Sequence, residues 1–139
     1  MLSESNPVSF VATVDPIRAR AFYEGVLGLT LIADEPVALV FDLNGHMWRI
    51  AKTNEIVPAN QTVLGWNVRD IAKELQLLSG RGVSFLRFDG MPQDAHGVWT
   101  SPSGARVAWF KDSDGNNLSL TECPSDRAIQ QPYAALRDP

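Results

Sequence analysis

Residues 111–122, KDSDGNNLSLTE, crowd oxygen-bearing side chains into a short stretch and could hold a metal ion. The possible ligands are Asp112, Asp114, Asn116 and Asn117. A calcium loop of this type needs ligands two residues apart and a glycine at its sixth place. Gly115 is only the fourth residue counted from Asp112, so the spacing excludes that loop. The stretch instead predicts a turn followed by a half-buried strand with alternating apolar and polar residues.

Nucleophilic chemistry has weak support in the sequence. Asp94, His96 and Ser101 contain the residue types of a catalytic triad, but no G-x-S-x-G elbow accompanies them. Cys123 ends a predicted strand and is expected to be a small core residue. For His46, in a turn, and His96, in a loop, we expect exposure or local hydrogen bonding in preference to metal binding.

Composition limits the possible classes of protein. A chain of 139 residues is the size of one domain, and its one cysteine excludes a disulfide framework and a cysteine-rich zinc site. The net charge is −4, from 12 basic and 16 acidic residues that are scattered along the chain. Nucleic acid and anionic membranes are therefore poor candidate partners. The N-terminus has no basic start or long apolar run, which favours a soluble, cytoplasmic protein.

The first half of the chain predicts a strand, a helix and three strands. Residues 8–15 are rich in β-formers and end at Asp15, which can cap a helix that begins with Pro16. Gly28 stands where that helix would end. Asn44-Gly45, between two alternating apolar runs, predicts a tight hairpin. The three predicted strands cover 29–34, 37–43 and 46–52.

After a polar linker at 53–60 the same order begins again. A strand at 62–68 and a helix at 69–82 are followed by a long loop that starts at Asp89. The remaining predicted strands cover 82–88, 97–100, 105–112 and 116–122. The chain therefore resembles two copies of one unit, about 8–52 and 61–123, within a single domain that ends in a tail, 124–139.

The repeat is also visible in the letters. Residues 42–50 and 112–120 align without a gap, and Asp15 corresponds to Asp70 at the start of each helix. This predicts an α+β fold of two βαβββ modules that form a curved mixed sheet with a cleft and with helices on the outer face. We expect function to lie in that cleft.

Two stretches of this sequence resemble the vicinal oxygen chelate superfamily, which contains glyoxalases, bleomycin resistance proteins and extradiol dioxygenases. They are VDPIRARAFYEGVLGL at 14–29 and VAWFKDSDGNNLSLTE at 107–122, and the resemblance extends over roughly 8–123. It implies the paired-module fold and a homodimer. It does not imply one reaction, because one architecture hosts several.

In metal-dependent members, the resemblance implies ligands from the opening and closing strand of each module. On this chain those positions are Val8, Val63, Arg49 and Ser119. Two hydrocarbons, a permanent cation and a lone hydroxyl form a poor ligand set. We therefore expect no metal and no cofactor.

Strand alternation predicts the side chains that line the cleft. The candidate ligand-binding residues are Phe10, Met47, Arg49, Val63, Asn67, Trp99 and Ser119. This set is apolar with a few polar groups, which is typical of a small-molecule pocket. Arg49 either favours an anionic ligand or forms an ion pair with Glu122, Asp42 or another acid.

The leading hypothesis is a metal-free protein that binds a small aromatic or amphipathic molecule. An alternative is a metal-dependent lyase or dioxygenase of the glyoxalase type, with a shifted ligand set that includes Gln61 or His96. A third is an interaction module without a small ligand. The identity of the ligand, the occurrence of catalysis, the pairing of modules within or between chains, and a lid role for 89–104 stay open.

Overall fold

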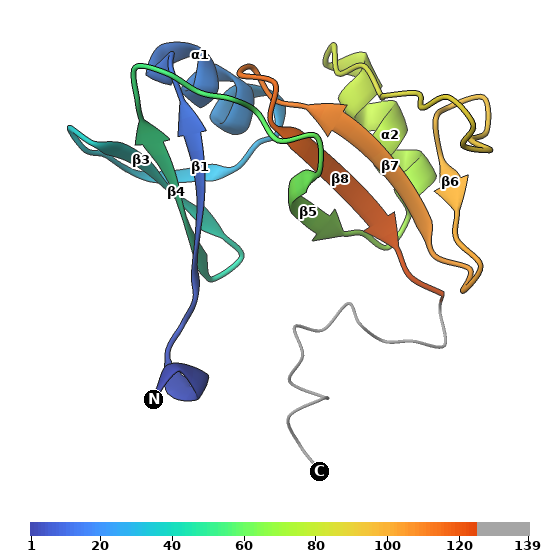
Figure 1. Cartoon of the computed structure of the whole chain (residues 1–139), viewed down its shortest axis with the longest axis horizontal. Helices are drawn as coiled ribbons and strands as arrows, with labels where there is room; N and C mark the ends of the chain where they lie inside the picture. Colours follow the sequence, from blue (N-terminus) through green and yellow to red (C-terminus); the bar gives the residue numbers. More distant parts are fainter. Residues whose placement is uncertain (125–139) are drawn as a thin grey trace. The chain divides into compact units, whose positions relative to one another are not determined.

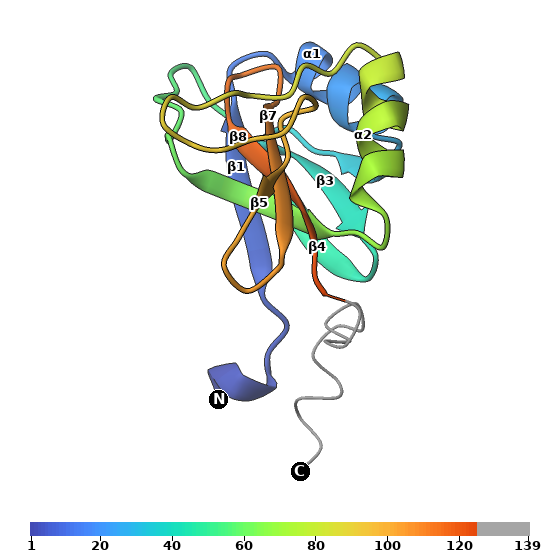
Figure 2. The same cartoon turned by 90° about the vertical axis from the view of Figure 1, so that its right-hand side faces the viewer.

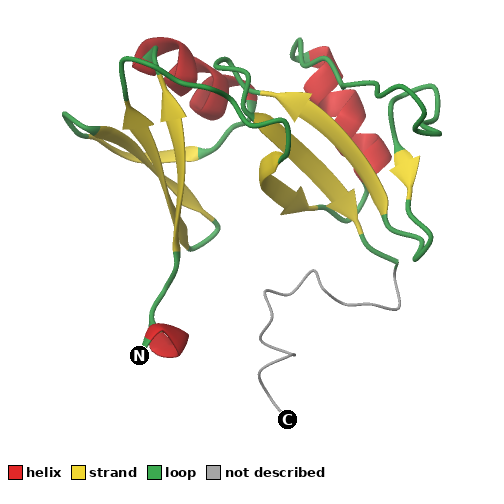
Figure 3. Ribbon diagram, viewed as in Figure 1, coloured by secondary structure: helices red, strands yellow, loops and turns green. Residues whose placement is uncertain are grey.

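In the computed structural model, residues 1–124 are described, and they form two βαβββ modules (Figure 1 and Figure 3). The first module follows a short 3-10 helix, η1 (Leu2–Glu4). Its elements are β1 (Val8–Thr13), α1 (Pro16–Arg20) with the π-helical turn η2 (Ala21–Val26), β2 (Thr30–Asp34), β3 (Ala38–Leu43) and β4 (His46–Lys52). The second contains β5 (Thr62–Asn67), α2 (Ile71–Gly80), β6 (Trp99–Thr100), β7 (Arg106–Lys111) and β8 (Asn117–Glu122). The predicted α+β class and its two modules are confirmed.

The chain divides into two compact units that do not follow the modules exclusively. Unit 1 contains Met1–Asn60 together with the turn Asp112–Asn116, and unit 2 contains Gln61–Lys111 and the chain from Asn117 onwards. The turn between β7 and β8 thus belongs to the unit of the first module. The predicted tail lies outside the described residues from residue 125 on.

Unit 1 is built on a four-stranded mixed sheet in the order β1-β4-β3-β2. β1 pairs in parallel with β4, and the other pairs are antiparallel. Tyr23 from η2 packs edge-on against Trp48 from β4, with ring centroids 4.5 Å apart, and also contacts Phe41 from β3. All three side chains are buried, so this aromatic cluster forms the core between the helix and the sheet.

The helix of unit 1 begins as its sequence predicts. The Asp15 carboxylate accepts a hydrogen bond of 3.1 Å from the backbone N–H of Arg18, and Pro16 occupies the first turn. Gly28 has a φ of 72°, the left-handed conformation that ends helices. After Arg20 the helix continues as a π-helical turn, which apolar spacing alone does not reveal.

A buried carboxylate holds the turn Asp112–Asn116. The two oxygens of Asp112 accept hydrogen bonds from the Tyr23 hydroxyl, the Asn116 side-chain amide, and the backbone N–H groups of Asp114 and Asn116. The Asn116 amide also donates to the Ala12 carbonyl at 3.1 Å, and Asp114 accepts from the backbone of Val14. These bonds connect the turn to η2 and to the end of β1 within unit 1.

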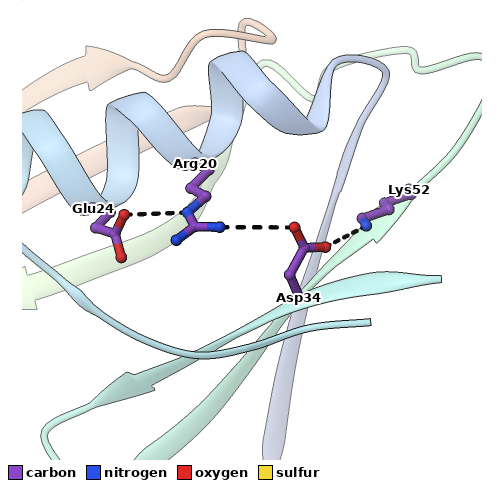
Figure 4. Close-up of polar contacts among 4 residues, drawn as sticks. All are labelled: Arg20, Glu24, Asp34 and Lys52. Carbon is purple, nitrogen blue, oxygen red and sulfur yellow. Dashed lines mark hydrogen bonds and ion pairs between the residues drawn. The ribbon is translucent and has the colours of Figure 1, made fainter. Parts of the chain in front are cut away.

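A second set of polar contacts connects the edge strand β2 to its neighbours (Figure 4). Asp34 pairs with Lys52 of β4 at 2.5 Å and with Arg20 of α1 at 3.8 Å, and Arg20 also pairs with Glu24 at 3.2 Å. The hydrogen bond from Lys52, helped by the charge of Arg20, lowers the pKa of Asp34 below its ordinary value. Because the side chains of Arg20, Glu24 and Asp34 are nearly half exposed, these ion pairs contribute little to stability.

Unit 2 has a four-stranded mixed sheet in the order β5-β8-β7-β6, with β5 and β8 parallel. The helix α2 covers one face of it (Figure 2). Asp70 caps α2 by accepting from the Lys73 backbone at 3.1 Å. Apolar residues of the helix and the sheet form the core, including Ile71, Leu75, Leu78, Ala108, Phe110 and Leu118.

The predicted strand at 82–88 is wrong as an extended strand. Phe85 forms one isolated bridge with Phe110, and Leu86 donates one backbone bond to Trp109. Beyond this point the Gln93 side chain bonds the Phe88 N–H and the Leu86 carbonyl, which are groups that a neighbouring strand would otherwise pair. A folded loop therefore replaces the strand, and β6 completes the module.

Replacing Tyr23 with Phe should destabilise unit 1, because Asp112 loses one of its donors in a buried environment. We expect a loss of about 1.5–3 kcal/mol in the free energy of unfolding, the range for hydrogen bonds to charged groups. Urea denaturation followed by tryptophan fluorescence measures it. Phe22→Leu, on the same helical turn, is the control and should cost less, because Phe22 is only half-buried.

The pair of Tyr23 and Asp112 also predicts that the free energy of unfolding depends on pH. Burial, followed by the Asp112 charge and hydrogen bond, raises the pKa of Tyr23 far above its ordinary value. The folded state therefore retains a proton that the unfolded state releases above about pH 10, and stability falls as the pH rises through that value. The difference in stability between wild type and Tyr23→Phe should narrow above pH 10. A constant difference would contradict this assignment.

Candidate functional site

The face of the unit 1 sheet turned away from the helix carries exposed apolar side chains. The β1–β4 register places Val8 beside Met47 and Phe10 beside Arg49. Phe10 is 64% exposed and Met47 is 46% exposed, whereas Trp48 and Ile50, on the opposite face, are buried. Three predicted site residues, Phe10, Met47 and Arg49, therefore lie together on one open face.

Arg49 projects from this face and pairs with Glu35. Its Nη2 lies 3.3 Å from Glu35 Oε2, and the two side chains are 25% and 41% exposed, respectively. Glu35 belongs to the turn between β2 and β3, where its backbone N–H donates to the Ala38 carbonyl. The predicted partners Glu122 and Asp42 do not contact Arg49: Glu122 pairs with Arg106, and Asp42 accepts from the Gly45 N–H.

The corresponding face of unit 2 carries an aromatic cluster. Register places Trp99 beside Val107, and Trp109 beside Ser119. The rings of Trp99 and Trp109 are 6.2 Å apart, and Phe88 meets Trp109 edge-on at 5.4 Å. We call Phe88, Trp99 and Trp109 the unit 2 aromatic cluster. It provides half-exposed aromatic surface on the side of the sheet opposite α2.

The loop next to this cluster is held by its own hydrogen bonds. The Gln93 amide donates to the carbonyls of Leu86 and Gly97 at 2.9 and 2.8 Å, and its oxygen accepts from the Phe88 N–H. The Arg87 guanidinium donates to the carbonyl of Asp94 at 2.8 Å. These contacts hold residues 86–97 together as one folded loop.

The other candidate residues of unit 2 differ in accessibility. Ser119 is 7% exposed, and a Cβ at Gly65, its register partner, would lie 2.6 Å from the Ser119 hydroxyl. Val63 is exposed and lies at a register shift between β5 and β8. The Asn67 side-chain oxygen accepts from the Cys123 thiol at 3.4 Å. Ser119 is thus largely buried, with its hydroxyl over Gly65, while Val63 and Asn67 are near the surface.

The triad residues considered from the sequence do not assemble. Ser101 bonds Ser103 and the backbone of Ala105, while Asp94 accepts from the backbone N–H groups of His96 and Val98. Partial burial acts to raise the pKa of Asp94, but these two N–H groups outweigh it and lower the pKa. Separately, His46 Nε2 lies 2.8 Å from the Ser9 hydroxyl, a local hydrogen bond of the expected kind.

A metal ion does not fit the residues at the family's ligand positions. Val8 and Val63 offer no lone pair, Arg49 is a cation already paired with Glu35, and Ser119 is a buried hydroxyl. Within residues 1–124, no three His, Cys, Asp or Glu side chains gather in a group that could hold a metal ion.

Sequence reasoning missed two features of these faces. Glu35 is the partner of Arg49 through a contact 14 residues away in sequence, and no local pattern indicates it. Trp109 joins Trp99 through the β6–β7 register, and alternation along 105–112 could have placed it opposite the buried Ala108 and Phe110.

The chain belongs to the glyoxalase/bleomycin resistance protein/dioxygenase superfamily, whose family model matches residues 7–120. A search of curated protein sequences finds no significant match. In the described part of the chain, no helix has the length and apolar composition needed to cross a membrane.

Solved structures resemble this fold at low sequence identity. A superfamily member from Sphaerobacter thermophilus DSM 20745 is 21% identical, with a TM-score of 0.68 over 88% of this chain and 99% of that one. A glyoxalase/bleomycin resistance protein/dioxygenase from Alicyclobacillus acidocaldarius is 19% identical, with a TM-score of 0.65 over 91% and 96%. A lactoylglutathione lyase from Agrobacterium tumefaciens is 18% identical, with a TM-score of 0.62 over 86% and 93%. At these identities the similarity establishes the fold alone.

The close approach of Gly65 and Ser119 gives a test of the unit 2 face. Gly65→Ala should cost about 1–3 kcal/mol in the free energy of unfolding, the usual range for overpacking. Adding Ser119→Ala removes the clashing hydroxyl, so the double variant should lose less than the sum of the single variants. Gly80→Ala, with open space around the new methyl group, is the control. Strict additivity in urea denaturation would contradict the contact.

Proposed function

We propose that this superfamily member binds a small aromatic or amphipathic molecule on an open sheet face, without a metal ion. The observation that carries the proposal is the exposed apolar row on unit 1, where Val8, Phe10 and Met47 lie beside Arg49. Contiguous exposed apolar side chains on a soluble fold are a usual mark of a binding surface. The unit 2 aromatic cluster offers a second surface of the same chemical character.

The chemistry of these faces is suited to holding a molecule. Aromatic rings supply large contact area, and Met47 adds a flexible, polarisable side chain that adapts to a ligand. On the unit 1 face Arg49 supplies a polar group that can orient a ligand, and on unit 2 Asn67 supplies another for a ligand bound there. The residues at the implied metal-ligand positions are poor ligands for a metal ion that would act as a Lewis acid on a substrate. This supports binding over the glyoxalase-type reaction.

Binding can be tested by isothermal titration calorimetry against planar aromatic compounds, both neutral and charged. We expect saturable binding to wild type, with a weaker affinity in Phe10→Ala for a ligand on the unit 1 face and in Trp99→Ala for a ligand on the unit 2 aromatic cluster. One buried aromatic contact is worth about 1–3 kcal/mol, or roughly 5- to 150-fold in affinity. Phe22→Ala, on the helix of unit 1, is the control that changes an aromatic residue away from the open face. Flat titrations across the panel would exclude the proposal.

The metal-dependent alternative has its own measurement. Elemental analysis of freshly purified protein should find no stoichiometric transition metal. The shifted ligand set would need Gln61 or His96, which are both exposed in the structure. A bound metal whose removal by a chelator abolishes lyase or dioxygenase activity, and whose content falls in His96→Ala, would overturn the binding proposal.

The proposal includes a cytoplasmic homodimer. Its basis is the family resemblance and the composition, since a net charge of −4 and a single cysteine suit a reducing compartment. Light scattering coupled to size-exclusion chromatography measures the oligomeric state. A monomer at all concentrations would remove this part and leave the ligand-binding proposal unaffected.

A further inference from the structure

We propose that the ligand of the unit 1 face is a planar aromatic acid, whose carboxylate replaces Glu35 as the partner of Arg49 while its ring lies against Phe10. The inference rests on the proposed function and adds the chemical class of the ligand. It also assigns Glu35 a role, as an internal counter-ion that a ligand displaces and that thereby determines specificity.

The guanidinium of Arg49 has N–H donors that no described residue uses. It carries five N–H donors. Among the described residues its polar contact is the one to Glu35, at 3.3 Å through Nη2. The side chain is three-quarters covered, so its stem is fixed on the sheet and its charge is only partly solvated. A carboxylate accepting two parallel hydrogen bonds from this group would make the stronger, charge-assisted form of the interaction.

Glu35 is a weak competitor of a ligand carboxylate for the Arg49 guanidinium. It lies in the turn between β2 and β3, its side chain is more exposed than that of Arg49, and its one polar side-chain contact within residues 1–124 is the 3.3 Å pair with Arg49. Ion pairs between partly exposed side chains contribute little, because water and salt screen them. Displacing Glu35 should therefore reduce the affinity of an incoming acid by no more than about 5-fold.

The position of Phe10 beside Arg49 favours an aromatic ligand. Phe10 is the register partner of Arg49 on the adjacent parallel strand, about 4.8 Å away across the sheet. Met47, one step along the same face, and Val8 beside it extend the apolar surface. Because the Arg49 guanidinium reaches Glu35 in the β2–β3 turn, on the far side of β4 from Phe10, one molecule that touches both groups must be extended, as a bicyclic aromatic acid is. A cationic aromatic molecule would instead have to pair with Glu35. That pair would be more strongly screened, because the Glu35 side chain is more exposed than that of Arg49.

The experiment compares three probes of equal ring size: 2-naphthoic acid, 2-naphthamide and 2-naphthylmethylamine. Calorimetry on the full chain measures each affinity at low and high salt. For wild type we expect the acid to bind more tightly than the amide and the amine, with a difference that shrinks as salt rises. Glu35→Gln should tighten the acid by up to about 5-fold and leave the amide unchanged. Arg49→Gln should weaken the acid by at least about 10-fold and spare the amide.

Matched controls come from the other face of the same unit. Glu24→Gln and Arg20→Gln remove the partners of a surface ion pair on the helix (Figure 4), with the same charge changes as the test variants. They should leave all three affinities as in wild type. Equal responses in test and control variants would show a general charge effect and overturn the inference.

The outcomes separate this inference from the function on which it rests. If the amide or the amine binds as tightly as the acid, and Arg49→Gln changes nothing, the aromatic-acid assignment fails while ligand binding stands. If none of the probes, and no other planar compound, binds any variant, both fail. Weaker binding of the acid in Glu35→Gln would also overturn the inference, since it would make Glu35 a contact of the ligand and not its competitor.

Discussion

The buried carboxylate of Asp112 is the constraint on which much of the structure depends. A charge withdrawn from water is tolerable only when donors surround it, and Asp112 receives four from Tyr23, Asp114 and Asn116. Those bonds fix the turn from which β8 departs. β8 leaves this turn with Leu118 and Leu120 facing α2 and with Ser119 on the open face beside Trp109. A turn of different length would exchange the two faces.

How far the sequence predicts the molecule depends on the range of each interaction. Local chemistry was sufficient for the capping residues Asp15 and Asp70, and for the Asn44-Gly45 hairpin, whose residues have φ of 53° and 90°. Strand alternation placed Arg49 opposite the buried Trp48. The strand at 82–88 failed because a side chain, Gln93, takes up backbone groups that composition assigned to a sheet. The ion pair of Arg49 with Glu35 has no periodic signal at all.

For the candidate site, strand alternation predicts the face on which a residue lies, but not how buried it is or what it contacts. Alternation could place Phe10, Met47 and Arg49 on one face, because that requires only period two. It could not show that Ser119 is buried with its hydroxyl over Gly65, since that contact arises only once the two strands are in register. Burial therefore ranks the unit 2 aromatic cluster above Ser119 as a contact surface, although strand alternation predicted only Ser119.

Arg49 stands at a position where the family resemblance implies a metal ligand, and an arginine there changes what the face can recognise. A metal ion accepts any oxygen donor and can share one between two groups of a substrate, whereas a guanidinium offers a fixed planar fork that suits a carboxylate. The ion also polarises a bound carbonyl strongly, which a dispersed positive charge does not do to the same extent. Because Glu35 already pairs with Arg49, an anion that takes two parallel hydrogen bonds from Arg49 would compete with Glu35 for its donors. This chemistry supports the proposed binding function.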